Sequence, residues 1–171
     1  ELFHGPTLAF KDFGARFISQ VLFYYTKKRK KKITILVATS GDTGSAVASA
    51  FLGMPYITVV LLYPKGKVSH IQEQQLTTKG ENIKAIEING TFDDCQRLVK
   101  EAFADKMLSE KLGFTSANSI NIARLLAQIF YFFYAYAQLP KNNLPVVFSV
   151  PCGNFGNLTA GLIAKKMGLP V

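Results

Sequence analysis

The chain has 171 residues, of which 49% are hydrophobic and 18% are charged, and its formal net charge is +9. This composition excludes a disordered chain, and the length is enough to bury a sizeable core. No metal-ligand spacing surrounds Cys95, Cys152, His4 or His70, so we expect no metal site and, given this cysteine usage, a cytoplasmic protein. The most apolar stretch, 128–139, is shorter than the roughly 20 residues that a membrane-spanning helix needs, so we expect no membrane span.

Short apolar, β-branched segments alternate along the chain with segments of helical length and periodicity. We expect strands at 33–38, 57–63, 83–88 and 146–150, and helices at 13–28, 43–52, 68–79, 92–108, 122–139 and 158–167. Nearly continuous apolar strands separated by helices are typical of a parallel sheet that is buried on both faces. The sequence therefore predicts an α/β protein with three layers, α/β/α, around a mostly parallel sheet.

Three features refine the predicted helices. Glycines stand where helix C-caps are expected, at Gly53, Gly80 and Gly168. Thr91 and Asp94 have the spacing of a capping box, with aspartate in place of glutamate. The helix 122–139 is apolar on most of its circumference, which predicts that it is buried between layers.

A run of six basic residues occupies 27–32. Such a run can bind nucleic acid or an anionic membrane surface. It lies between an expected helix and an expected strand, and no nucleic-acid module accompanies it, so a solvated loop is the favoured interpretation.

Lys11 lies between Phe10 and Phe13, just before the first expected helix. A lysine in apolar surroundings has a lowered pKa, and its neutral amine can attack a carbonyl group. The alternative is a lysine at a helix start that extends its ammonium into solvent.

Two loops have the order strand, glycine-rich turn, helix: 38–44 and 151–157. Glycines let backbone N–H groups approach a ligand closely, and a helix N-terminus favours an anion. The sequence therefore indicates anion binding at the carboxyl edge of a sheet, although ordinary turns would use the same glycines.

Arg124 is expected in the first turn of an apolar helix, after the polar segment 116–121. A buried cation at this end of a helix is unfavourable unless an anion accompanies it. A bound anion and a carboxylate partner within the protein both satisfy this requirement, and spacing alone does not choose between them.

The segments 1–12, 39–45, 118–124 and 153–157 resemble, in this order, the threonine synthase family. These are pyridoxal-phosphate enzymes with a fold related to the tryptophan synthase β subunit. The resemblance runs through the whole chain and implies an internal fragment of a two-lobed protein, incomplete at both ends. Residues 1–32 and 140–171 would belong to the larger, cofactor-binding lobe, and 33–139 would form the smaller one.

The resemblance also implies a pyridoxal 5'-phosphate cofactor, a small phosphorylated amino acid as substrate, and threonine biosynthesis as the role. The reaction would convert O-phospho-L-homoserine and water to L-threonine and phosphate, with Lys11 carrying the cofactor and transferring protons. The other implied cofactor contacts are Asp42, Gly153, Asn154, Phe155, Gly156 and Asn157. The implied substrate contacts are Thr39, Ser40, Thr43, Asn118, Ser119 and Arg124.

Two other functions remain open from the residues. One is a similar phospholyase with the same cofactor and a different product, and the other is a nucleic-acid-binding protein that uses the basic run. Because the resemblance implies that parts of both lobes lie outside this chain, we expect the chain alone to have little or no activity. The oligomeric state is not indicated.

Overall fold

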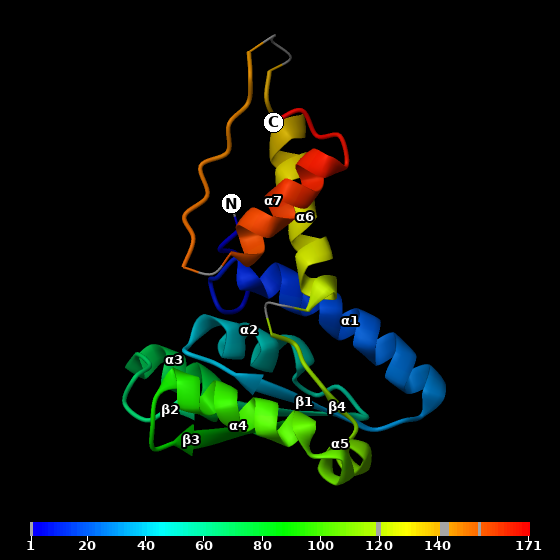
Figure 1. The fold of residues 1–171 in the computed structure, drawn as a ribbon, viewed down its shortest axis with the longest axis vertical. Helices are drawn as coiled ribbons and strands as arrows, with labels where there is room; N and C mark the ends of the chain where they lie inside the picture. Colours follow the sequence, from blue (N-terminus) through cyan, green and yellow to red (C-terminus); the bar gives the residue numbers. More distant parts are fainter. Residues whose placement is uncertain (1, 119–120, 141–143, 154) are drawn as a thin grey trace.

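A parallel sheet forms the lower part of the molecule in Figure 1, in a computed structural model that describes residues 2–118, 121–140, 144–153 and 155–171. Within these residues the sheet has four strands in the order β3-β2-β1-β4, all parallel. The strands are β1 (Ile33–Ala38), β2 (Ile57–Pro64), β3 (Ile83–Ile88) and β4 (Phe114–Thr115). The first three strands confirm the prediction, whereas β4 is too short for its residue pattern to be recognised.

Helices cover both faces of the sheet, because successive side chains of a strand point to opposite faces. Ile35 and Val37 of β1 join a core with α1 (Lys11–Arg29) and α2 (Asp42–Phe51). Leu36 and Ala38 join a second core with α4 (Phe92–Ala104). The short helix α3 (His70–Thr77) contributes Leu76 to the first core. The predicted α/β/α layers are therefore confirmed.

The single helix predicted at 92–108 is wrong, because α4 ends at Ala104 and α5 (Lys106–Leu112) begins after one residue. That residue, Asp105, is extended (φ −73°, ψ 102°), and its carboxylate accepts a hydrogen bond of 3.0 Å from the N–H of Leu108. An aspartate cap thus starts a new helix where the apolar spacing suggested continuation.

Two helices stand above the sheet layers in Figure 1: α6 (Ile122–Ala137) and α7 (Gly156–Lys166). They pack on each other around their own core, which includes Phe132 and Ala160. Glycines permit the close approaches: a Cβ added to Gly161 would lie 2.8 Å from the Phe132 ring, and one added to Gly14 of α1 would lie 3.4 Å from the carbonyl oxygen of Arg124. Helix α1 thus packs against α6 as well as α2, and it joins the two parts of the structure.

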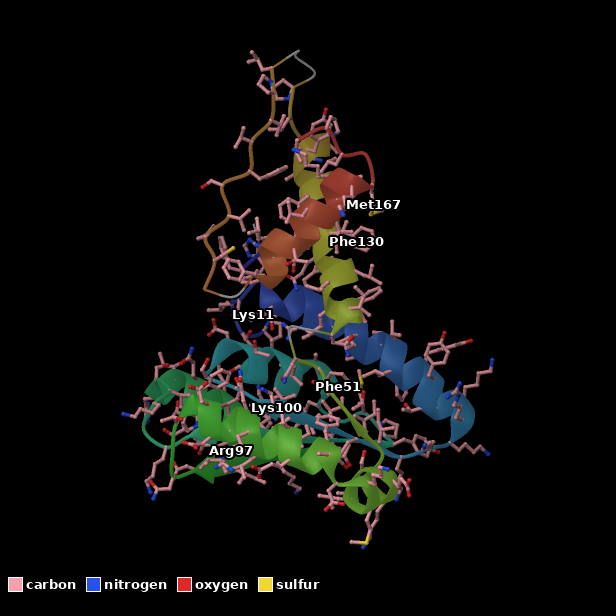
Figure 2. The ribbon with its side chains drawn as sticks, viewed as in Figure 1. Lys11, Phe51, Arg97, Lys100, Phe130 and Met167 are labelled. Atoms are coloured by element: carbon pink, nitrogen blue, oxygen red, sulfur yellow. The ribbon has the colours of Figure 1, made fainter. Side chains whose placement is uncertain are left out.

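The prediction that helix 122–139 is buried between layers holds for one side only. Arg124, Ala127, Gln128, Ile129 and Phe132 are buried on the side that faces α1 and α7. The opposite side exposes apolar side chains at every fourth position, at Ile122, Leu126, Phe130 and Tyr134 (Phe130 is labelled in Figure 2).

The strand predicted at 146–150 is also wrong, since these residues have no strand assignment. The parallel sheet that the structure describes does not include them. Instead, Phe148 and Val150 pack against the core of α6 and α7, and the Phe148 ring lies edge-on to Phe132 at a centroid distance of 5.2 Å. A β-branched apolar pattern predicts burial, but a strand also needs a hydrogen-bonded neighbour.

Two of the three predicted glycine caps and the predicted capping box are confirmed. Gly53 and Gly168 have left-handed φ values of 71° and 103° directly after the C-cap residues of α2 and α7. Gly80 is also left-handed (φ 65°), but α3 already ends at Thr77 with its cap at Thr78. The capping box joins the N–H of Thr91 to the Asp94 carboxylate at 2.8 Å, and the N–H of Asp94 donates to the Thr91 hydroxyl at 3.3 Å.

The basic run begins inside α1, with Lys27, Lys28 and Arg29 in the last helical turn, where cations are favourable. Lys30 then ends the helix in a left-handed conformation, so the solvated loop is shorter than predicted. Among the described helices, none combines the length and the apolar character that crossing a bilayer requires.

Candidate active site

Lys11 is the first residue of α1, and a fixed loop precedes it. The buried carboxylate of Asp12 accepts hydrogen bonds from the Thr7 N–H (2.9 Å) and the Thr7 hydroxyl (2.7 Å). The Tyr131 hydroxyl of α6 donates to the carbonyl oxygen of Phe10 at 2.8 Å. Burial raises the pKa of Tyr131, which keeps this donor protonated. The backbone beside Lys11 is therefore held from both sides.

The Lys11 ammonium faces a carboxylate as well as an aromatic ring. Its Nζ lies 3.4 Å from Oδ2 of Asp42 and 5.2 Å from the centroid of the Phe10 ring, and its side chain is 23% exposed. Figure 2 shows Lys11 at the start of α1, above α2 in this view. The aromatic contact fits the apolar surroundings that the sequence predicts, whereas the acidic partner was not predicted.

The loop between β1 and α2 brings Asp42 to this position. The Thr39 hydroxyl is buried and accepts from the N–H groups of Gly41 (3.0 Å) and Gly44 (2.8 Å), which closes the loop. Ser40 is exposed, and Thr43, on the first turn of α2, is half-buried. Thr39 thus holds the loop shape, and its predicted substrate contact stays a prediction, as do those of Ser40 and Thr43.

Arg124 is 1% exposed in the first turn of α6, as predicted. Asn121 caps the helix by accepting from the Ala123 N–H at 3.0 Å, and Nη1 of Arg124 donates to the Ala117 carbonyl oxygen at 3.0 Å. Burial lowers the pKa of Arg124 to about 10, so the group is cationic at neutral pH. Among the described residues no carboxylate pairs with it. This favours the interpretation in which an external anion binds.

Four buried polar atoms in the described part of the chain have no hydrogen-bond partner: Oδ1 of Asn118, Nε of Arg124, Oε1 of Gln128 and Oδ1 of Asn157. Leaving such groups unsatisfied is unfavourable, so their concentration at predicted site residues indicates a ligand. Gln128 was not predicted. Its position one turn after Arg124, in an otherwise apolar helix, is the signal that could have found it.

The second glycine-rich loop leads into α7. Gly153 and Phe155 are exposed, Gly156 begins the helix, and Asn157 is half-buried in its first turn. Phe155 occupies the N-cap position and makes no side-chain capping bond. Two predicted contacts, Ser119 and Asn154, lie outside the described residues.

Helix α6 lies against both helices that carry the other candidate groups. Both α1 and α7 pack on α6, and Tyr131 of α6 contacts Phe10 and Phe13, on either side of Lys11. In the view of Figure 1, the first turn of α7 is drawn beside the start of α1. The structure therefore combines a part-buried amine, an uncompensated cation and a helix start that suits an anion.

The family of pyridoxal-phosphate dependent enzymes matches residues 1–171, and the chain belongs to this family. The chain is similar to the threonine synthases of Buchnera aphidicola subsp. Acyrthosiphon pisum (62% identical over 172 residues) and Escherichia coli K12 (60%), in each case over 100% of this chain and 40% of the relative. The crystal structure of the E. coli threonine synthase matches with a TM-score of 0.92 at 60% identity, over 100% of this chain and 40% of that chain. The structure of a pyridoxal-phosphate-bound threonine synthase from Brucella melitensis matches with a TM-score of 0.90 at 45% identity, over 100% and 37%.

The resemblance to threonine synthase, the cofactor family and the α/β fold predicted from the sequence are therefore confirmed. The chain spans about 40% of the length of the curated relatives that it matches.

The residues present fit pyridoxal phosphate, which carries an aldehyde and a phosphate group. Lys11 supplies an amine in a largely protected position. The first turn of α7, with the unpartnered Oδ1 of Asn157 nearby, supplies polar groups at a helix N-terminus.

Proposed function

We propose that the protein containing this chain converts O-phospho-L-homoserine and water to L-threonine and phosphate. The observation that carries the proposal is Arg124, a fully buried guanidinium with no carboxylate partner in the described part of the chain, on a helix that packs directly on the helix of Lys11. A phosphorylated amino acid supplies the missing anion. The 60–62% identity to threonine synthases supports the choice of substrate.

Lys11 is proposed to bind the cofactor covalently through Nζ and to move protons at the substrate carbons. When bound, pyridoxal phosphate supplies an electron sink that stabilises carbanions. The Tyr131 and Thr7 hydrogen bonds around the start of α1 keep the Lys11 backbone in place. Such fixed positioning is what a residue that both gives and takes protons requires.

Arg124 is proposed to bind the substrate phosphate with its planar guanidinium, assisted by Asn118 and Ser119. In a buried setting this cation stabilises the charge on a departing phosphate better than it would in water. Ser40 and Thr43 are proposed to contact the substrate carboxylate, in a loop that Thr39 shapes.

The remaining proposals concern the cofactor phosphate, the lobes and the compartment. The cofactor phosphate is assigned to the first turn of α7, through Gly153, Asn154, Phe155, Gly156 and Asn157. We also propose two lobes, 1–32 with 140–171 and 33–139. The core of α6 and α7 joins residues on both sides of this boundary, and α1 contributes Ala15 and Ile18 to the sheet core. Cys95 and Cys152 are both free, which suits the cytoplasm. No nucleic-acid or membrane partner is proposed.

The reaction can be tested in a complete enzyme. Residues 1–171 would replace the matching segment of the E. coli threonine synthase, and O-phospho-L-homoserine turnover would be measured as phosphate and L-threonine. We expect equal amounts of both products, and a loss of about 10³-fold or more in Lys11→Ala. Lys100→Ala, at an exposed lysine of α4, is the matched control and should leave turnover unchanged. We expect the 171-residue chain alone to turn over little or no substrate.

If phosphate is released together with an amino acid other than threonine, the result would support the similar phospholyase reaction in place of threonine synthesis. A folded, cofactor-loaded chimaera that releases no phosphate would contradict the proposal.

A further inference from the structure

Gln72 of α3 links the loop of Asp42 to a neighbouring helix. Its side-chain oxygen accepts from the Ser69 N–H at 3.1 Å, and the N–H of Gln72 donates to the Ser69 hydroxyl at 3.3 Å, which forms the capping box of α3. The same side chain has a second partner, because its Nε2 donates to Oδ1 of Asp42 at 2.7 Å. One amide therefore caps its own helix and binds the carboxylate that faces Lys11.

The loop leaves space for this contact at Gly41. Gly41 is buried with φ +142°, and a Cβ placed there would collide with the Gln72 amide. A side chain at position 41 would thus push Gln72 away from Asp42. The glycine is needed here for close approach as well as for its backbone conformation.

Asp42 needs an external hold to face Lys11. Its side chain is 48% exposed, and its Oδ2 lies 3.4 Å from Nζ of Lys11, which is long for a charge-assisted hydrogen bond. A half-exposed aspartate with only this weak contact would exchange rotamers in water. The shorter bond from Gln72 to Oδ1 leaves Oδ2 pointing at the ammonium. The other carboxylate near the start of α1, Asp12, is occupied by Thr7.

We propose that Gln72 is a positioning residue, which acts on Lys11 by fixing the carboxylate of Asp42 beside Nζ. The inference rests on the proposed function only in taking Lys11 as the cofactor lysine. The contact chain itself, from Gln72 through Asp42 to Lys11, is independent of the reaction.

The test measures the reactivity of Lys11 in the protein without cofactor. Trace acetylation with acetic anhydride at pH 7.5 labels amines that are free to react, and mass spectrometry of the peptide that contains residue 11 gives its rate relative to the exposed Lys100. In Gln72→Met the carboxylate loses its hold, the ion pair that engages Nζ opens, and Lys11 should acetylate about two- to fivefold faster, the range for a part-exposed ion pair. Asp42→Asn should give the same increase, and the double variant should add nothing further.

Ser69→Ala is the matched control, because it weakens the same capping box but leaves the Gln72 amide on Asp42. It should leave the Lys11 rate unchanged, whereas an effect equal to that of Gln72→Met would mean that Gln72 acts only by capping α3. If the methionine variant does not fold, Gln72→Ala, which places a good helix former in α3, repeats the test.

An unchanged or slower rate in Gln72 variants, or effects of Gln72 and Asp42 that add, would overturn the proposal. Because acetylation needs neither cofactor nor substrate, its outcome is separate from that of the turnover assay.

Discussion

Arg124 is the residue with the least favourable surroundings in the candidate site. Its pKa of about 10 corresponds to a burial penalty of roughly 3 kcal/mol for the charged form, as an order of magnitude. A base whose pKa is lowered in the folded protein destabilises the fold while it is charged, and the penalty is relieved only as pH rises above about 10. At neutral pH the penalty is therefore constant, and a bound anion would offset it.

Inorganic phosphate should stabilise the protein through Arg124. At about ten times its dissociation constant, phosphate should raise the thermal unfolding midpoint by about 3–6 °C in the wild-type protein at pH 7.5. Arg124→Met should abolish this shift, since an uncharged apolar side chain cannot bind the anion. Arg97→Met, at an exposed arginine paired with Glu101, should retain it. Equal shifts in both variants, measured by thermal unfolding, would assign the effect to other sites.

Sequence reasoning at this scale found residue types but not their contacts. Lys11 and Asp42 were both predicted, yet their separation by 31 positions in the sequence hid their 3.4 Å contact. Gln72 and Gln128 were missed because a glutamine has no chemistry of its own to attract notice. Their importance comes from what lies beside them after folding.

The helix caps were the most predictable elements, since a capping box is a local interaction between residues three apart. Hydrogen bonds from the Thr91 backbone N–H, and then from its hydroxyl, lower the pKa of Asp94. A carboxylate with a lowered pKa adds stability above its unfolded pKa, near 4, and loses it as pH falls through the folded value.

Asp94→Asn should therefore lower the unfolding midpoint at pH 7, and this deficit should shrink as pH falls through the lowered pKa of the wild-type carboxyl. Thermal unfolding followed by circular dichroism across this pH range measures the difference. Asp93→Asn, in the same helical turn but without the capping bonds, is the control and should show a smaller pH dependence. A deficit that does not shrink as pH falls would contradict the role of the charge.

The two wrong elements have different causes. The helical spacing of apolar residues continues past Asp105, so the sequence pattern predicts one helix. Asp105, an aspartate at a helix N-cap position, is the one feature of the sequence that marks the break between α4 and α5. Residues 146–150 have the composition of a buried strand, and their side chains are indeed packed at Phe148 and Val150. A residue pattern reports the burial of side chains and not the backbone neighbour that makes a strand.

The layered arrangement around the sheet was predictable from the sequence. A parallel sheet that is buried on both faces requires nearly continuous apolar strands with helices between them, and the sequence has this pattern. The placement of α6 and α7 on α1 was not, because it depends on close contacts at Gly14 and Gly161 between distant parts of the chain. These contacts set Arg124 against α1 and α7 against α6, so the residue types of the candidate site could be predicted from the sequence but not their arrangement.

The central claim is that Lys11 is the amine that binds pyridoxal phosphate. The most direct measurement is borohydride reduction of the protein after incubation with the cofactor, followed by peptide mapping of the stable adduct. The account predicts one dominant adduct on Lys11 that disappears in Lys11→Ala. Adducts spread over the exposed lysines of 27–32, with none concentrated on Lys11, would contradict it.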